Sequence, residues 1–171
     1  MKLGLGTAAL GRPQYINVRQ KNSKNSDLDT FKKHSFSVLE AAYNSGIRYF
    51  DTAPGYGLAE ELVLEWLRTK DDRSIEVATK WGYTYTANFN ENATVHEVKE
   101  HSVSKLNEQW NLSKQLLPYL KVYQIHSATL ETGVLENTEV LERLAFLKRE
   151  HNLKIGLTTT GTNQVEVIKK A

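Results

Sequence analysis

The chain has 171 residues, enough for one domain with a sizeable hydrophobic core. Its 22 Lys and Arg against 20 Asp and Glu leave a net charge of +2, too near balance to predict nucleic acid or an anionic membrane as a partner. Because the chain contains no Cys, disulfides, thiolate metal sites and a cysteine nucleophile are excluded.

The first residues do not resemble a signal peptide. One Lys and a short apolar run broken by glycines precede Arg12 and Pro13, and no later stretch has the length of a membrane span. We therefore expect a cytoplasmic protein without a membrane partner.

Five short apolar runs are predicted as strands, with amphipathic helices between them. The predicted strands are residues 2–7, 46–51, 75–80, 121–126 and 154–158. The predicted helices are residues 29–44, 59–68, 94–110, 139–150 and 164–170, and the stretches 12–27 and 81–93 are predicted loops. Alternation of strand and helix predicts parallel strands joined by right-handed crossovers. Unbroken apolar strands are typical of a sheet covered on both faces. The expected architecture is a single α/β domain over residues 1–171.

The stretch GLGTAA at residues 4–9 matches the G-x-G-x-x-G/A pattern of dinucleotide-binding folds. That pattern needs a helix directly after it, because the helix N-terminus binds the pyrophosphate. Here Gly11, Arg12 and Pro13 interrupt, and a polar stretch follows. We interpret these glycines instead as leaving room at the exposed end of a barrel strand.

Polar side chains end three of the predicted strands. Asp51 ends the second, Lys80 the third and His126 the fourth, and Tyr56 lies on a glycine-flanked turn after Asp51. Taken singly, each has a structural explanation: a turn cap, a lysine reaching solvent, a core histidine and a loop aromatic. In parallel α/β folds, however, the loops after the strands carry the ligand. The four together therefore predict a site on one face.

These four groups suit proton transfer to an oxygen. A phenol with a pKa of about 10 is a poor proton donor at neutral pH, unless a nearby cation stabilises the phenolate. A carboxylate can hold that cation, and an imidazole can orient a carbonyl oxygen. The set predicts carbonyl reduction with an external hydride donor. No metal site is expected, since His96 and His101 are five residues apart and off the chelating i, i+4 spacing.

The sequence resembles the aldo-keto reductases in LGLGTAALG, GIRYFDTAPGYG, VATKWG and YQIHS, which follow in the expected order along essentially the whole chain. The resemblance implies a (β/α)8 barrel and a catalytic tetrad. In it, Tyr56 is the general acid, Lys80 lowers its pKa, Asp51 holds Lys80, and His126 orients the substrate carbonyl. It also implies NADPH, or NADH, as cofactor, bound without a Rossmann loop. The expected cofactor-binding residues are Gly6, Thr7, Asp51, Thr158 and Thr159.

The sequence departs from the family in two respects. Thr158 and Thr159 stand where the family often has a Ser-Asn pair on the nicotinamide carboxamide, so the amide is missing. An eight-fold barrel also needs about 250 residues, and this chain contains about five strand–helix units. We therefore expect an incomplete, truncated barrel whose first and last strands have open edges.

Three functional hypotheses remain open. The first is an oxidoreductase that reduces a small aldehyde or ketone, with Trp81 and Tyr85 lining the substrate pocket. The second is a catalytically silent half-barrel that forms homo-oligomers, or binds another protein, through its open edges. The third is a flavodoxin-like binding module of five parallel strands, which gives no reason for the four polar residues.

Overall fold

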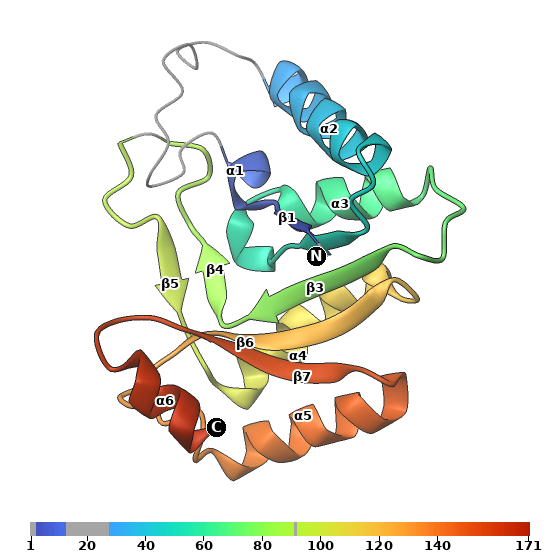
Figure 1. The fold of residues 1–171 in the computed structure, drawn as a ribbon. Helices are drawn as coiled ribbons and strands as arrows, with labels where there is room; N and C mark the ends of the chain where they lie inside the picture. Colours follow the sequence, from blue (N-terminus) through green and yellow to red (C-terminus); the bar gives the residue numbers. More distant parts are fainter. Residues whose placement is uncertain (1–2, 13–27, 91) are drawn as a thin grey trace.

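The computed structural model describes residues 3–12, 28–90 and 92–171 (Figure 1). Residues 13–27 of the predicted loop and residue 2 of the first predicted strand lie outside these ranges. Within them, no helix is both long and apolar enough to cross a membrane.

A five-stranded parallel sheet in the order β1-β2-β3-β6-β7 forms the framework of the chain. Its strands are β1 (Gly4–Gly6), β2 (Tyr49–Asp51), β3 (Glu76–Trp81), β6 (Leu120–Ala128) and β7 (Lys154–Thr159). Each strand pairs with the next parallel strand along the chain, as right-handed strand–helix units predict. All five predicted strands are confirmed, although β1 and β2 are shorter than expected. The fold is α/β, consistent with an incomplete (β/α)8 barrel.

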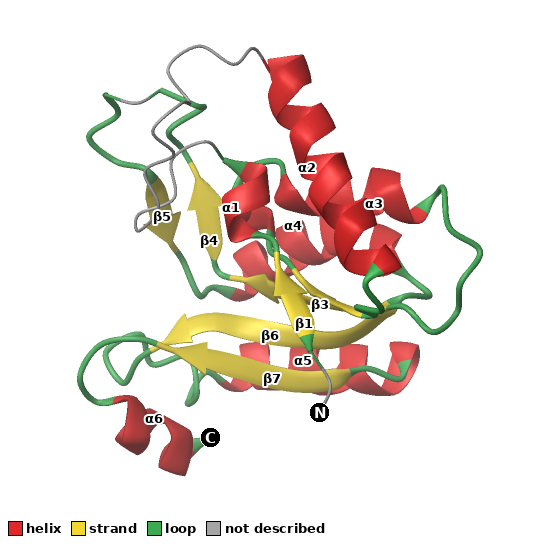
Figure 2. Ribbon diagram, turned by 45° about the horizontal axis from the view of Figure 1, so that its top comes forward, coloured by secondary structure: helices red, strands yellow, loops and turns green. Residues whose placement is uncertain are grey.

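The helices are α1 (Ala8–Gly11), α2 (Leu28–Asn44), α3 (Ala59–Leu67), α4 (Val103–Ser113), α5 (Thr138–His151) and α6 (Gln164–Lys170). Two single turns of 3-10 helix, η1 (Pro54–Tyr56) and η2 (Lys114–Leu116), follow β2 and α4. Side-chain caps fix the starts of α4 and α5. Ser102 accepts a hydrogen bond from the Lys105 amide, and Asn137 accepts one from the Val140 amide. Helix α4 packs against β3 and α5 against β7 (Figure 2).

The prediction was wrong at residues 83–85 and 94–102, where a β-hairpin replaces part of the predicted loop and the first part of a predicted helix. Strands β4 (Tyr83–Tyr85) and β5 (Glu97–Lys99) pair antiparallel as a separate two-stranded sheet. Val95 and Val98, which fall within the predicted helix 94–110, are 55% and 48% exposed. The helix begins only at Val103, because the Ser102 cap starts it there.

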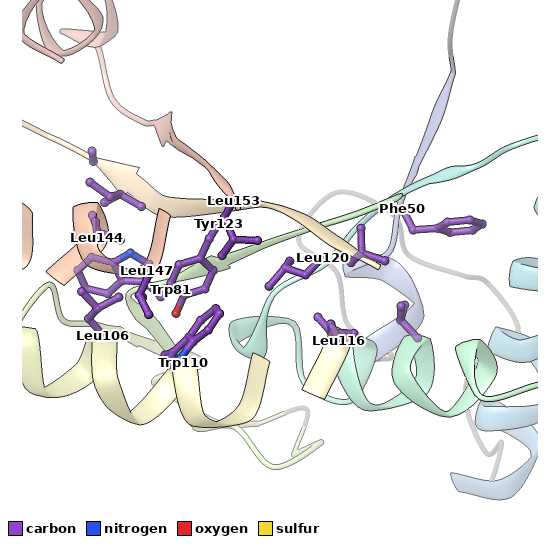
Figure 3. Packing of buried hydrophobic residues seen from close by; sticks show 14 of the residues in the cluster. Phe50, Trp81, Leu106, Trp110, Leu116, Leu120, Tyr123, Leu144, Leu147 and Leu153 are labelled. Carbon is purple, nitrogen blue, oxygen red and sulfur yellow. The ribbon is translucent and has the colours of Figure 1, made fainter. Parts of the chain in front are cut away.

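The hydrophobic core lies mainly between the sheet and helices α3, α4 and α5. Figure 3 shows the aromatic rings of Trp81, Trp110 and Tyr123 among leucines of α4 and α5. The rings of Trp110 and Tyr123 meet edge to face, with centroids 5.3 Å apart. This packing fixes β3 and β6, the two adjacent inner strands that carry Lys80 and His126.

Candidate active site

The turn that carries Tyr56 packs closely against the first strand–helix unit. Gly57 adopts a left-handed φ of 66°, and the Leu58 amide donates to the Gly11 carbonyl at 2.8 Å. A Cβ added to Gly11 would lie 1.8 Å from the Tyr56 carbonyl oxygen, and one added to Gly57 would lie 2.4 Å from the Gly11 oxygen. Glycine is required at both positions, so that η1 can hold Tyr56 at the end of β2.

Lys80 and Asp51 form an ion pair across neighbouring strands. The Lys80 ammonium donates to Asp51 Oδ1 and, at 3.1 Å, to the Thr52 carbonyl. Lys80 is only 4% exposed, and burial lowers its pKa, although the Asp51 carboxylate opposes this shift. The pair therefore holds a desolvated cation at one fixed place.

Tyr56 and His126 face each other above this ion pair. The Tyr56 hydroxyl lies 3.5 Å from His126 Nε2, and the two rings meet edge to face with centroids 5.3 Å apart. The Lys80 Nζ lies 4.8 Å from the centroid of the Tyr56 ring. The structure thus brings together all four residues that the sequence grouped, and their catalytic roles remain predictions.

The surroundings of His126 favour a neutral imidazole. Burial and the positive charge of Lys80 lower its pKa to about 3, with smaller contributions from His101, Lys99 and Arg12. At neutral pH the ring is therefore uncharged and able to donate one N–H to an oxygen placed beside Tyr56.

Two further residues that the sequence analysis did not single out belong to this site. The Tyr83 ring on β4 packs edge to face on His126 at a centroid distance of 4.8 Å. Gln124 on β6 donates through Nε2 to Asp51 Oδ2 at 3.4 Å, so it helps to orient the carboxylate. Gln124 could have been found from strand alternation, since it lies two residues before His126 on the same face.

The two predicted substrate-pocket residues lie in different surroundings. Trp81 is 0% exposed and belongs to the hydrophobic core, with its ring 5.4 Å from that of His101. Tyr85 is half-buried on β4, and its hydroxyl accepts the Phe89 amide at 3.0 Å. A substrate contact by Trp81 needs its neighbours to move, and both assignments remain predictions.

The predicted cofactor residues lie at the carboxyl ends of β1, β2 and β7. Thr7 is buried, and its hydroxyl donates to the Asp51 carbonyl at 2.9 Å. Nothing lies within 4 Å of a Cβ added to Gly6, so open space remains beside it. At the other edge, Thr158 accepts the Ser127 amide at 2.7 Å, and the Thr159 hydroxyl bonds Gln164 at 3.2 Å. Hydroxyl groups can hydrogen-bond a carboxamide, so the chemistry of these residues suits a nicotinamide.

A buried carboxyl lies behind the site. Glu60 of α3 is 8% exposed and accepts hydrogen bonds from the hydroxyls of Thr79 and, at 2.7 Å, Ser113. It thereby joins α3 to β3 and α4. Burial raises its pKa to about 7, and the two hydroxyls only partly offset this.

The raised pKa of Glu60 predicts a specific pH dependence of stability. Since the folded state keeps this proton above the unfolded pKa of 4.5, the stabilisation is complete below about pH 4.5 and is lost as pH rises through 7. We expect wild type to lose roughly 3 kcal/mol relative to Glu60→Gln between pH 4.5 and 7.5. Urea unfolding at both pH values measures this. The control variant Glu61→Gln, at an exposed neighbouring residue, should show the same change in stability as wild type. A difference in free energy of unfolding between wild type and Glu60→Gln that does not change with pH would contradict the prediction.

The chain is similar to proteins of one known family. A model of the Aldo/keto reductase family matches residues 2–171. Pyridoxal 4-dehydrogenase from Microbacterium luteolum is 43% identical over 86 residues, which are 49% of this chain and 21% of that protein. D-threo-aldose 1-dehydrogenase from a Pseudomonas species is 34% identical over 85 residues, 47% of this chain and 26% of that protein.

Solved structures resemble the whole described fold. An aldo-keto reductase from Bacillus halodurans, in its holo form, superposes with a TM-score of 0.69 at 23% identity. The match covers 99% of this chain and 50% of that one. The chain therefore spans about half the length of this neighbour. Its matched segments cover 21% and 26% of the lengths of the two dehydrogenases above.

Proposed function

Since this chain belongs to the aldo/keto reductase family, we propose that it carries the active centre of an NAD(P)H-dependent reductase acting on a small aldehyde or ketone. One observation carries the proposal: Tyr56 lies next to both the Lys80–Asp51 ion pair, whose lysine is buried, and the His126 imidazole, which is 3.5 Å from its hydroxyl. The site supplies an acid and an oxygen-binding group, and reduction of a carbonyl needs no nucleophilic side chain. That combination suits reduction by an external hydride donor.

The proposed mechanism assigns one role to each side chain. His126 donates a hydrogen bond to the carbonyl oxygen and places it beside the Tyr56 hydroxyl. Tyr56 then gives its proton to that oxygen, as the carbonyl carbon receives hydride. The Lys80 ammonium stabilises the resulting phenolate, and Asp51 holds Lys80 at the required position.

The hydride would come from the nicotinamide of NADPH or NADH when that cofactor is bound. Gly6 and Thr7 on one side, and Thr158 and Thr159 on the other, would hold the ring against Asp51. The support for this assignment is their position at the carboxyl ends of the strands and the open space beside Gly6.

Turnover by the purified chain tests this function. We expect oxidation of millimolar NADPH, followed by absorbance at 340 nm, that depends on an added small aldehyde. NADH is tested in parallel. Equal oxidation with and without aldehyde, for both cofactors, would contradict the proposal.

A second candidate function is assembly through the sheet edges, and the strand pairing favours it. Among the described residues, β1 pairs only with β2 and β7 only with β6, so each has one open edge. Leu3, next to β1, is 61% exposed. Open edges of this kind pair readily with further strands. A homo-oligomer that reduces no carbonyl, seen by light scattering with the turnover assay, would favour this alternative over the reductase.

A further inference from the structure

The strand that carries His126 is distorted directly after this residue. The pairing of β6 with β7 shifts register between Ile125 and Ala128. Within this bulge Ser127 has a φ of 54°, a left-handed conformation that is strained for any residue with a Cβ. Such bulges bend a strand and re-aim the side chains beside them. The conformation of Ser127 therefore sets the angle at which the end of β6 presents the imidazole.

Three side chains hold the peptide groups of this bulge. The Thr158 hydroxyl on β7 accepts the Ser127 amide at 2.7 Å. Lys99 on β5 donates through Nζ to the Ser127 carbonyl at 2.9 Å. His101, in the segment between β5 and α4, bonds through Nε2 to the His126 carbonyl at 2.9 Å.

These bonds come from both sides of β6. Thr158 belongs to the neighbouring strand of the main sheet, whereas Lys99 and His101 belong to the hairpin and the segment after it. His101 is itself fixed, because its ring packs edge to face on the buried Trp81 at 5.4 Å. Lys99 Nζ also lies 5.4 Å from the centroid of the Tyr83 ring, which packs on His126. The strained backbone is thus held between the core and the hairpin.

We propose that Lys99, His101 and Thr158 are positioning residues that hold the β6 bulge so that His126 Nε2 faces the Tyr56 hydroxyl. The relevance of this to catalysis rests on the proposed reductase function. The hairpin thereby contributes to the site, because it supplies Lys99 and leads directly to His101. Thr158 can serve this role as well as the expected cofactor role, since a hydroxyl can accept the Ser127 amide and still donate its own proton.

Three threonine variants test the proposal by NMR in the full chain. Thr158→Val removes the acceptor at nearly constant shape, Thr158→Ser keeps it, and Thr162→Val removes an exposed hydroxyl beyond the end of β7. Two quantities are measured: hydrogen exchange of the Ser127 amide, and the nuclear Overhauser effect between the rings of Tyr56 and His126. The Thr52 amide, which donates to the Ala78 carbonyl at 2.8 Å, is the internal reference.

We expect Thr158→Val to speed exchange at Ser127 by at least about fivefold, the effect of one lost hydrogen bond, with no change at Thr52. The signal between the Tyr56 and His126 rings should weaken in the same variant. Thr158→Ser and Thr162→Val should behave as wild type. Wild-type exchange at Ser127, with an undiminished ring signal in Thr158→Val, would overturn the proposal.

If Thr158→Val unfolds, exchange at the Thr52 amide will speed up as well. In that case, a pair of lysine variants tests the positioning role instead. Lys99→Met removes the bond to the Ser127 carbonyl, and Lys121→Met removes a similar bond to the Pro118 carbonyl. Only Lys99→Met should weaken the ring signal, and equal signals in both variants would contradict the positioning role. Neither readout needs turnover. A chain that reduces no carbonyl would thus count against the proposed function. The nuclear Overhauser effect between the Tyr56 and His126 rings would still test the positioning role.

Discussion

Tyr56→Phe is expected to lower kcat for carbonyl reduction by about 10²- to 10⁴-fold, the usual contribution of a positioned general acid. The substitution removes only the hydroxyl that lies 3.5 Å from His126 Nε2 and leaves the ring above Lys80. Steady-state kinetics with NADPH and an aldehyde measure the loss. Cofactor affinity, followed by the heat of binding, should change little, because the proton is needed only in the chemical step.

The matched control for this variant is Tyr119→Phe. It removes a hydroxyl that donates to the Lys70 carbonyl at 3.1 Å, away from the strand ends of the candidate site. This variant should keep the wild-type rate. A Tyr56→Phe rate within a few-fold of wild type would remove Tyr56 from the role of proton donor.

Lys80→Met is expected to lower kcat by at least about 100-fold, because a cation next to the Tyr56 ring is lost while Asp51 keeps its place. Lys80 and Asp51 should act as a unit. Asp51→Asn alone should slow the reaction, and the double variant should be about as slow as Lys80→Met, since residues that act together show non-additive effects.

Lys70→Met is the control for the loss of a lysine in an ion pair. Lys70 bonds Glu40 at 2.5 Å and lies outside the site, so its removal should leave the rate unchanged. If Lys80→Met reduced carbonyls at the wild-type rate, the proposed tuning of Tyr56 by a buried cation would be wrong.

The sequence predicted the framework of the fold because its signals there are local. The apolar runs ending in Asp51, Lys80 and His126 are strands in the structure, and their order along the chain is their order in the sheet. Parallel strands place such end residues on one edge. For this reason, the grouping of a carboxylate, an ammonium, a phenol and an imidazole was predictable without a structure.

The hairpin and the bulge were not predictable in the same way. Residues 94–102 were predicted as the start of a helix, whereas Val98 pairs with Thr84 across the hairpin and is 48% exposed. The left-handed Ser127 has no residue-type signal, since glycine or asparagine is the usual residue there. Both features depend on contacts between segments far apart in the chain. Lys99 and Tyr83, which belong to the hairpin, were therefore missed as parts of the site or its support.

The measurement that tests most directly whether this chain builds the site is an NMR titration of the His126 ring nitrogens. A preorganised site, in which burial and Lys80 disfavour the imidazolium, predicts a pKa of about 3 and a neutral ring throughout pH 5 to 8. A pKa near the ordinary value of 6.5 would show an imidazole in water, away from Lys80. That result would contradict the assembly of Tyr56, Lys80 and His126 into one site, and with it the proposed mechanism.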